Sequence, residues 1–97
     1  MEQGEILEAL DKIYHFYRYI PKLTMQTLDR GGRELALKAM RKEYPRCRMS
    51  GGRRTFLQVS GDGIRISKDG ETEVVNWEDY LQYVIDRERN TTLPLPP

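Results

Sequence analysis

The sequence contains too little cysteine and histidine for several kinds of site. Among its 97 residues are one cysteine, Cys47, and one histidine, His15. A single cysteine has no partner for a disulfide within the chain, and one residue of each type is too few for a Cys/His metal site. We therefore expect no bound metal and a reducing, cytoplasmic environment.

Long apolar runs are also missing. No stretch approaches the length of about 18 apolar residues that a transmembrane helix needs, so we expect no membrane partner. The first residues are acidic where a secretory signal would be basic, and we expect no such signal. Hydrophobic residues make up 38% of the chain and charged residues 32%. These values and the short length are typical of one small globular domain.

The sequence has no motif that would carry a cofactor or a reaction. The glycine-containing segments 50–52 and 61–63 fit neither of the phosphate-binding patterns G-x-x-x-x-G-K-[ST] and G-x-G-x-x-G. Cys47 lies between two arginines, which favour its thiolate, but His15 belongs to a distant predicted helix and is no obvious base for it. We therefore expect no cofactor, no catalytic residue and a protein that is not an enzyme.

What the sequence does have is charge that is separated along the chain. The net charge is +1, yet residues 30–54 carry nine basic and two acidic residues, a net of +7. The flanking segments 1–29 and 55–97 have net charges of −2 and −4. A basic segment of this kind attracts phosphate groups or an acidic protein surface. Pairing with the acidic C-terminal half of the same chain is the competing interpretation.

Apolar residues at helical spacing predict two helical regions in the first half of the chain. The first covers residues 4–19 and should end at Pro21, because the residue before a proline disfavours helical geometry. The second covers residues 23–43 and should be broken at Gly31 and Gly32, since glycine is unfavourable inside a helix. Pro45 should close it.

After Pro45, the spacing of apolar residues changes from that of a helix to the alternation of a strand. Residues 54–60, 64–68 and 72–75 predict an antiparallel meander, with residues 46–49 as an optional fourth strand and residues 50–52 as a loop. Asp69-Gly70 favours a tight hairpin turn. The face packed on the helices should contain the following residues: Leu57, Val59, Ile64, Ile66 and Val74.

Asn76 has the side chain of a helix N-cap, and the apolar residues after it predict a last helix. The element order is then α-α-β-β-β-α. This order predicts an α+β, two-layer domain with a small antiparallel meander packed by helices. We expect the compact domain to cover residues 1–89, followed by a disordered, proline-rich tail over residues 90–97.

Basic residues near the predicted 50–52 loop are the first candidates for a binding site. Residues 46–54 contain four arginines around a glycine pair, and arginine binds phosphate through two parallel hydrogen bonds. The preceding helix end extends this set, which is Arg41, Lys42, Arg46, Arg48, Arg53 and Arg54. The competing interpretation is a solvated loop whose arginines pair with acidic residues of segment 71–79. The predicted sheet offers one aromatic residue that could stack on a base, Phe56, and it lacks the pattern of several aromatic residues that the RNP motifs of RNA-binding sheets use.

Aromatic residues of the first predicted helix are the second candidates. Phe16 and Tyr19 fall outside its main apolar stripe, and exposed aromatic residues are enriched at interfaces. Burial against the second helical region is the alternative interpretation. The apolar surface of this helix also leaves a homo-oligomer open.

These features predict a small interaction protein, namely an inhibitor, adaptor or regulator that binds a macromolecular partner through the basic loop and the exposed aromatic residues. This profile is common among regulators of phages and mobile elements. A protein partner is the first expectation. The alternative is a nucleic-acid-binding protein that uses residues 30–54, whose affinity would fall steeply with salt as phosphate contacts release counterions.

Overall fold

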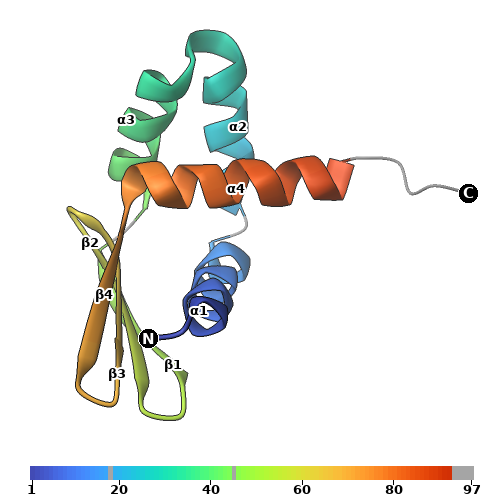
Figure 1. Ribbon diagram of the computed structural model, residues 1–97. Helices are drawn as coiled ribbons and strands as arrows, with labels where there is room; N and C mark the ends of the chain where they lie inside the picture. Colours follow the sequence, from blue (N-terminus) through green and yellow to red (C-terminus); the bar gives the residue numbers. More distant parts are fainter. Residues whose placement is uncertain (18, 45, 93–97) are drawn as a thin grey trace, which may run out of the picture.

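A computed structural model describes residues 1–17, 19–44 and 46–92, with the backbone alone described for residues 19–22 and 90–92. This part of the chain forms four helices and one four-stranded sheet (Figure 1). The predicted α+β class and the antiparallel meander are confirmed. The elements are α1 (Gln3–Phe16), α2 (Tyr19–Gly31), α3 (Arg33–Glu43), β1 (Cys47–Gly52), β2 (Thr55–Ser60), β3 (Gly63–Lys68), β4 (Glu71–Asn76) and α4 (Trp77–Thr92).

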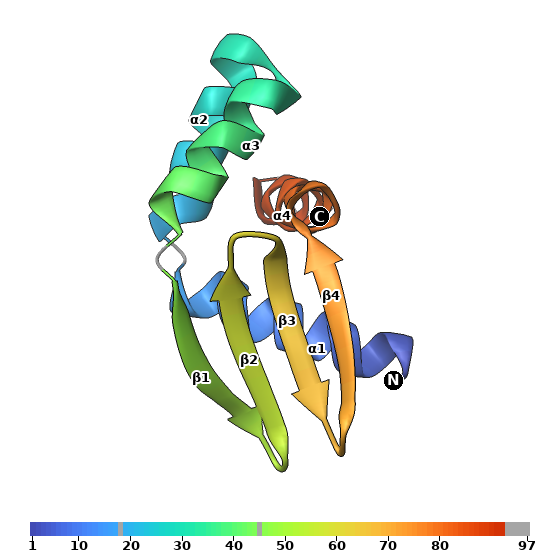
Figure 2. The same cartoon turned by 90° about the vertical axis from the view of Figure 1, so that its left-hand side faces the viewer.

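The sheet is a simple meander with the strand order β1-β2-β3-β4. One face of it is covered by α1, which crosses behind the sheet in Figure 2, while α4 lies across one end. Lys12 of α1 donates a hydrogen bond to the carbonyl of Gly51. Lys68 of β3 lies 3.3 Å from the Glu5 carboxylate of α1. These contacts and a shared apolar core hold α1 against the sheet.

The core lies between this covered face and the helices. Leu57, Val59, Ile64 and Ile66 are buried there as predicted. Buried residues of the helices pack against them, namely Ala9, Leu10, Ile13, Tyr14, Ala36, Leu37, Met40, Trp77, Tyr80, Leu81, Val84 and Ile85. Tyr44 joins this cluster, and its ring meets those of Trp77 and Tyr80 edge-on.

Val74 does not belong to the covered face, contrary to the prediction. It pairs with Arg65 across the β3–β4 ladder, while Val75 pairs with the buried Ile64. Because side chains alternate between the two faces of a strand, this register turns Val75 toward the core and Val74 away from it. Val74 is 46% exposed.

The boundary between the first two helices also differs from the prediction. α1 ends at Phe16 and α2 begins at Tyr19, so a single helix over 4–19 is wrong. Pro21 lies in the first turn of α2 instead of terminating the preceding helix. The first turn tolerates proline because its backbone N–H groups have no partner within the helix. The predicted break at the glycine pair is confirmed, since α2 ends at Gly31 and Gly32 has a φ of +83°.

The optional fourth strand is present, and it is longer than predicted. β1 includes residues 50–52, where a loop was expected, and the connection to β2 is formed by Arg53 and Arg54. Gly51 is buried, and a Cβ at this position would lie 2.9 Å from Cγ2 of Thr55. Close packing therefore explains glycine at this position better than loop flexibility does.

The last helix begins as predicted. The Asn76 side-chain oxygen accepts a hydrogen bond of 2.9 Å from the Asp79 backbone N–H, which is the N-cap contact. α4 continues to Thr92, so its end lies inside the segment predicted as a tail, and residues 93–97 lie outside the described part of the chain. None of the helices in the described part of the chain is long and apolar enough to cross a membrane.

Candidate functional site

The fold separates the basic residues that are close together in the sequence. Arg41 and Lys42 are exposed on the last turn of α3. Arg53 and Arg54 form the turn at the other end of β1 (Figure 1). A strand of this length spans about 20 Å. The prediction of a basic loop is therefore wrong, because most of residues 46–54 form a strand. The basic residues before and after this strand lie in different parts of the molecule.

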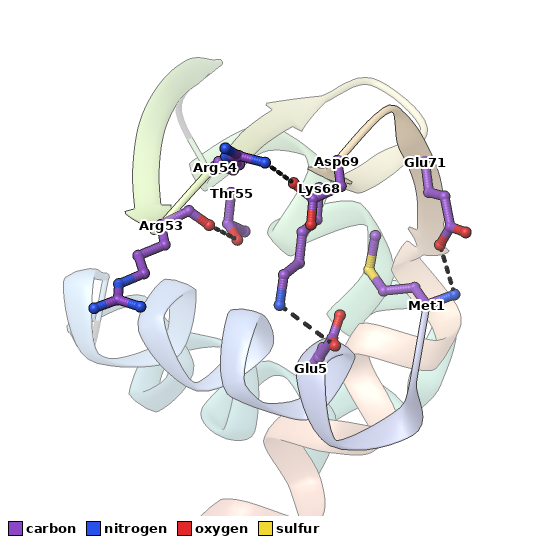
Figure 3. Close-up of polar contacts among 8 residues, drawn as sticks. All are labelled: Met1, Glu5, Arg53, Arg54, Thr55, Lys68, Asp69 and Glu71. Atoms are coloured by element: carbon purple, nitrogen blue, oxygen red, sulfur yellow. Dashed lines mark hydrogen bonds and ion pairs between the residues drawn. The ribbon is translucent and has the colours of Figure 1, made fainter.

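The arginines at the two ends of β1 make local contacts. Arg46 is exposed, and its Nη1 donates a hydrogen bond of 3.1 Å to the carbonyl of Tyr44. Arg54 lies 3.7 Å from the Asp69 carboxylate, whereas the Arg53 side chain points away from this pair (Figure 3). Both members of the Arg54–Asp69 pair are largely exposed, so their attraction is weakened by solvent. The Arg54–Asp69 contact joins the basic segment to the acidic C-terminal half, but Asp69 lies outside the segment 71–79 that was expected to supply the partners.

Arg48 lies near the start of β1, on the sheet face opposite α1. We call this face the open face, since no helix of the described chain covers it (Figure 2). It is turned toward the viewer in that figure. Its side chains follow from the alternation along the four strands and the pairing between them: Arg48, Ser50, Phe56, Gln58, Ser60, Arg65, Ser67, Thr72, Val74 and Asn76.

The strand register arranges these residues in two rows across the sheet. One row places Arg48 and Arg65 on either side of Gln58. The adjacent row places Ser50 and Ser67 on either side of Phe56. Phe56 is 65% exposed, so the open face has a large aromatic ring between small hydroxyl side chains.

The open face is positively charged. It has two arginines, and none of its ten residues carries a carboxylate. An acidic residue at the edge of this face is Asp62, in the turn before β3, whose Oδ2 lies 3.5 Å from Nη2 of Arg65. Arg48 is exposed, and its guanidinium is therefore available to an incoming anion. The acidic residues of β4 contribute to the opposite face, where Glu73 pairs with Ile66.

A shallow groove of about 480 Å³ lies on this face beside Phe56. It is lined by Arg48, Met49, Phe56, Leu57, Gln58 and Ser67. An aromatic ring, an amide, a hydroxyl and a guanidinium thus border one groove. This combination offers stacking, hydrogen bonding in both directions and an anion contact within a small area.

Sequence reasoning placed Arg48 in the site but missed Gln58, Arg65 and Val74. Arg65 and Gln58 could have been found from the alternation itself. Because Leu57, Val59, Ile64 and Ile66 were predicted to be buried, the residues between them had to face the other side of the sheet. The absence of a helix on that side could not be read from the pattern.

The second set of candidates is less well defined. Phe16 is 66% exposed at the end of α1, with its ring edge-on to that of Tyr17. The burial alternative is therefore wrong for Phe16. α1 covers the sheet face opposite the open face, so Phe16 belongs to a different element and face from Phe56. The side chain of Tyr19 lies outside the described part of the chain.

A cluster of titratable residues joins α1 to α4 and was not predicted. The Asp11 carboxylate accepts a hydrogen bond of 3.0 Å from the Tyr83 hydroxyl and lies 2.8 Å from Nη2 of Arg87. His15 lies 3.4 Å from the same carboxylate and 3.1 Å from Arg87. Burial and the hydrogen bond to Asp11 raise the pKa of Tyr83. These groups bind one another, which is the arrangement expected of a contact between helices.

No three or more His, Cys, Asp or Glu side chains of the described residues are grouped so that they could hold a metal ion. Cys47 is half-buried and contacts the Tyr17 hydroxyl through its sulfur. Burial, together with the contact with Cys47, raises the pKa of Tyr17.

Comparison of the chain with protein-family models, with curated protein sequences and with solved structures finds no match in any of the three.

Proposed function

We propose that the protein is a non-enzymatic interaction protein that binds a negatively charged macromolecular partner on its open face. The observation that carries this proposal is the exposure of Phe56 on an uncovered sheet face, with Arg48 and Arg65 in the adjacent row of side chains. The predicted roles of inhibitor, adaptor or regulator all require such a surface. A cytoplasmic location and a homo-oligomer stay predictions.

The composition of the open face supports this proposal. Aromatic residues and arginine are enriched where interfaces obtain most of their binding energy. The open face has two arginines and no carboxylate, so it favours a partner of opposite charge and increases the rate at which that partner associates. Compared with the sequence prediction, the proposed surface keeps Arg48, moves away from the turn at Arg53 and Arg54, and adds Arg65 and Phe56.

Direct binding measurements with two labelled polyanions test the proposal. One probe is a single-stranded oligothymidylate and the other is a polyglutamate peptide of matched charge, both followed by fluorescence anisotropy at low and at raised salt. We expect at least one probe to bind. The double variant Arg48→Ala/Arg65→Ala should weaken that binding about tenfold, which corresponds to about 1.4 kcal/mol.

The matched control removes the same charge elsewhere. Arg41→Ala/Lys42→Ala also deletes two cations, but at the exposed end of α3. It should change the affinity much less than the open-face variant does. The proposal is wrong if neither probe binds at low salt, or if the two double variants weaken binding equally. Circular dichroism spectra of all variants establish that they remain folded.

A further inference from the structure

We infer that the partner of the open face is a single-stranded nucleic acid, with one base stacked on Phe56 and the adjoining phosphates bound by Arg48 and Arg65. This inference rests on the proposed function, since it names the class of polyanion that the open face binds. It concerns a strip across β1, β2 and β3 (Figure 2), not the basic segment as a whole.

The surroundings of Phe56 favour a base over a protein side chain. In protein interfaces, aromatic anchors are found in well-packed pockets with apolar contacts around them. Phe56 instead has Ser50 and Ser67 as its neighbours on the adjoining strands. Small hydroxyl side chains leave the flat face of the ring accessible, which is what stacking of a base requires.

The row beside Phe56 supplies groups for the remaining parts of a nucleotide. Arg48 and Arg65 lie on β1 and β3, each paired with Gln58 of β2. Strands lie about 4.8 Å apart, so the backbones of the two arginines are separated by about 10 Å. Each guanidinium can bind a phosphate through two hydrogen bonds. The Gln58 amide can donate to and accept from the edge of a base.

The groove beside Phe56 has the size and lining for one stacked base. Its volume of about 480 Å³ lies within the range of about 300–1,000 Å³ that small-ligand sites occupy. Phe56 supplies the apolar lining, while Arg48, Gln58 and Ser67 add polar groups. Met49 and Leu57 also border the groove, but their side chains belong to the covered face. A duplex keeps its bases stacked and paired, which prevents a surface ring from reaching a base face. Unstacked, single-stranded bases are the form that an exposed aromatic ring can bind.

The decisive experiment separates the base from the phosphate backbone. Anisotropy titrations compare an oligothymidylate with an abasic deoxyribose-phosphate oligomer of the same length and charge. We expect the wild-type protein to bind the oligothymidylate about tenfold more tightly, since stacking on one aromatic side chain contributes this order of affinity. Phe56→Ala should remove the difference between the two oligomers and leave the affinity for the abasic one unchanged.

Phe16→Ala is the matched control. Phe16 is 66% exposed, compared with 65% for Phe56, but it lies on α1. This variant should bind both oligomers as the wild type does. A Phe56→Trp variant supplies a second readout, because stacking of a base quenches tryptophan fluorescence. Trp77 is 2% exposed, so its signal should stay constant during the titration.

The outcomes distinguish the inference from the proposed function. Equal affinity for the thymidylate and abasic oligomers, with loss of both in Arg48→Ala/Arg65→Ala, would overturn base stacking and leave the polyanion site intact. Binding of polyglutamate but not of oligothymidylate would also overturn base stacking and leave the polyanion site intact. Failure of every polyanion to bind would overturn both. An oligouridylate titrated in parallel tests RNA. The inference is supported if either nucleic acid binds more tightly than the abasic oligomer and Phe56→Ala removes this difference.

Discussion

Gly63 occupies a position at the start of β3 where a larger residue does not fit. Its φ is +140°, and a Cβ at this position would lie 2.1 Å from the carbonyl oxygen of Val75. Gly63→Ala must therefore push β3 and β4 apart locally or change the backbone conformation. We expect a loss of about 3 kcal/mol of stability, toward the upper end of single-residue effects. Urea unfolding followed by circular dichroism measures it.

Gly61 gives the matched control in the same turn. A Cβ at Gly61 would have no heavy atom within 4 Å, and its φ does not require glycine. The Gly61 carbonyl accepts a hydrogen bond from Trp77, and an alanine would keep that acceptor. We expect Gly61→Ala to change stability by no more than about 0.5 kcal/mol. Similar losses for the two variants would show that the close approach to Val75 does not matter.

Single residues were predictable where alternation is unambiguous. Leu57 and Val59, and then Ile64 and Ile66, are separated by polar or exposed residues, so their shared face could be predicted from the sequence. Val74 and Val75 are adjacent and equally apolar, and alternation cannot choose between them. The pairing of Val75 with Ile64 decides the choice, and that register arises from the hairpin turn at Asp69 and Gly70 rather than from either valine.

At the scale of elements, the start of α4 depends on the side chain of Asn76. Its oxygen satisfies the backbone N–H of Asp79 at 2.9 Å. Asn76→Ala leaves that donor without its partner at the helix N-terminus. We expect a loss of about 1 kcal/mol, which lowers the thermal midpoint by about 4–8 °C in a domain of this size. Asn76→Asp keeps an acceptor at the same place and should retain most of the stability. An alanine variant as stable as the aspartate variant would contradict the cap.

The boundaries of elements were predictable where a residue type favours a single position relative to a helix or strand. Gly31 and Gly32 were expected to break the helix and do so. Pro21 is compatible with two positions, because proline is common both after the end of a helix and in its first turn. The sequence does not distinguish these two positions. Gly51 and Gly52 were interpreted as a loop, yet Gly51 is buried in β1 against Thr55 and Leu57. Only the packing of the sheet shows why glycine is needed there.

At the scale of the whole molecule, charge along the chain and charge on the surface differ. The basic segment 30–54 extends from the end of α2 over α3 and β1 to the turn after β1. Its net charge is therefore spread over opposite ends of the fold. The open face instead combines Arg48 with Arg65, which lies outside that segment. Such a site depends on strand order and on which face α1 covers. Neither is fixed by local sequence, so the candidate site was predictable only through Arg48 and the isolated ring of Phe56.

The aromatic core predicts how the whole molecule responds to alkaline pH. Burial raises the pKa of Tyr80 and of Tyr44, and for Tyr80 the nearby Tyr44 raises it further. In the unfolded chain, tyrosine ionises near a pKa of about 10. Above that pH the unfolded chain loses protons that the folded protein keeps, so stability must fall as pH rises. Below pH 10 both states keep these protons, and the effect should be absent.

The expected slope is up to about 1.4 kcal/mol per pH unit for each tyrosine that stays protonated in the folded state. Urea unfolding between pH 8 and pH 11 (roughly the range that brackets the free tyrosine pKa) measures it, and absorbance of tyrosinate follows ionisation in parallel. Tyr80→Phe keeps the ring but removes one titrating group and the 3.2 Å hydrogen bond from Tyr44. This variant should be less stable at pH 8 and should lose stability less steeply above pH 10. A slope unchanged by Tyr80→Phe would mean that Tyr80 ionises in the folded protein, and hence that its hydroxyl is reached by water when the helices are still packed.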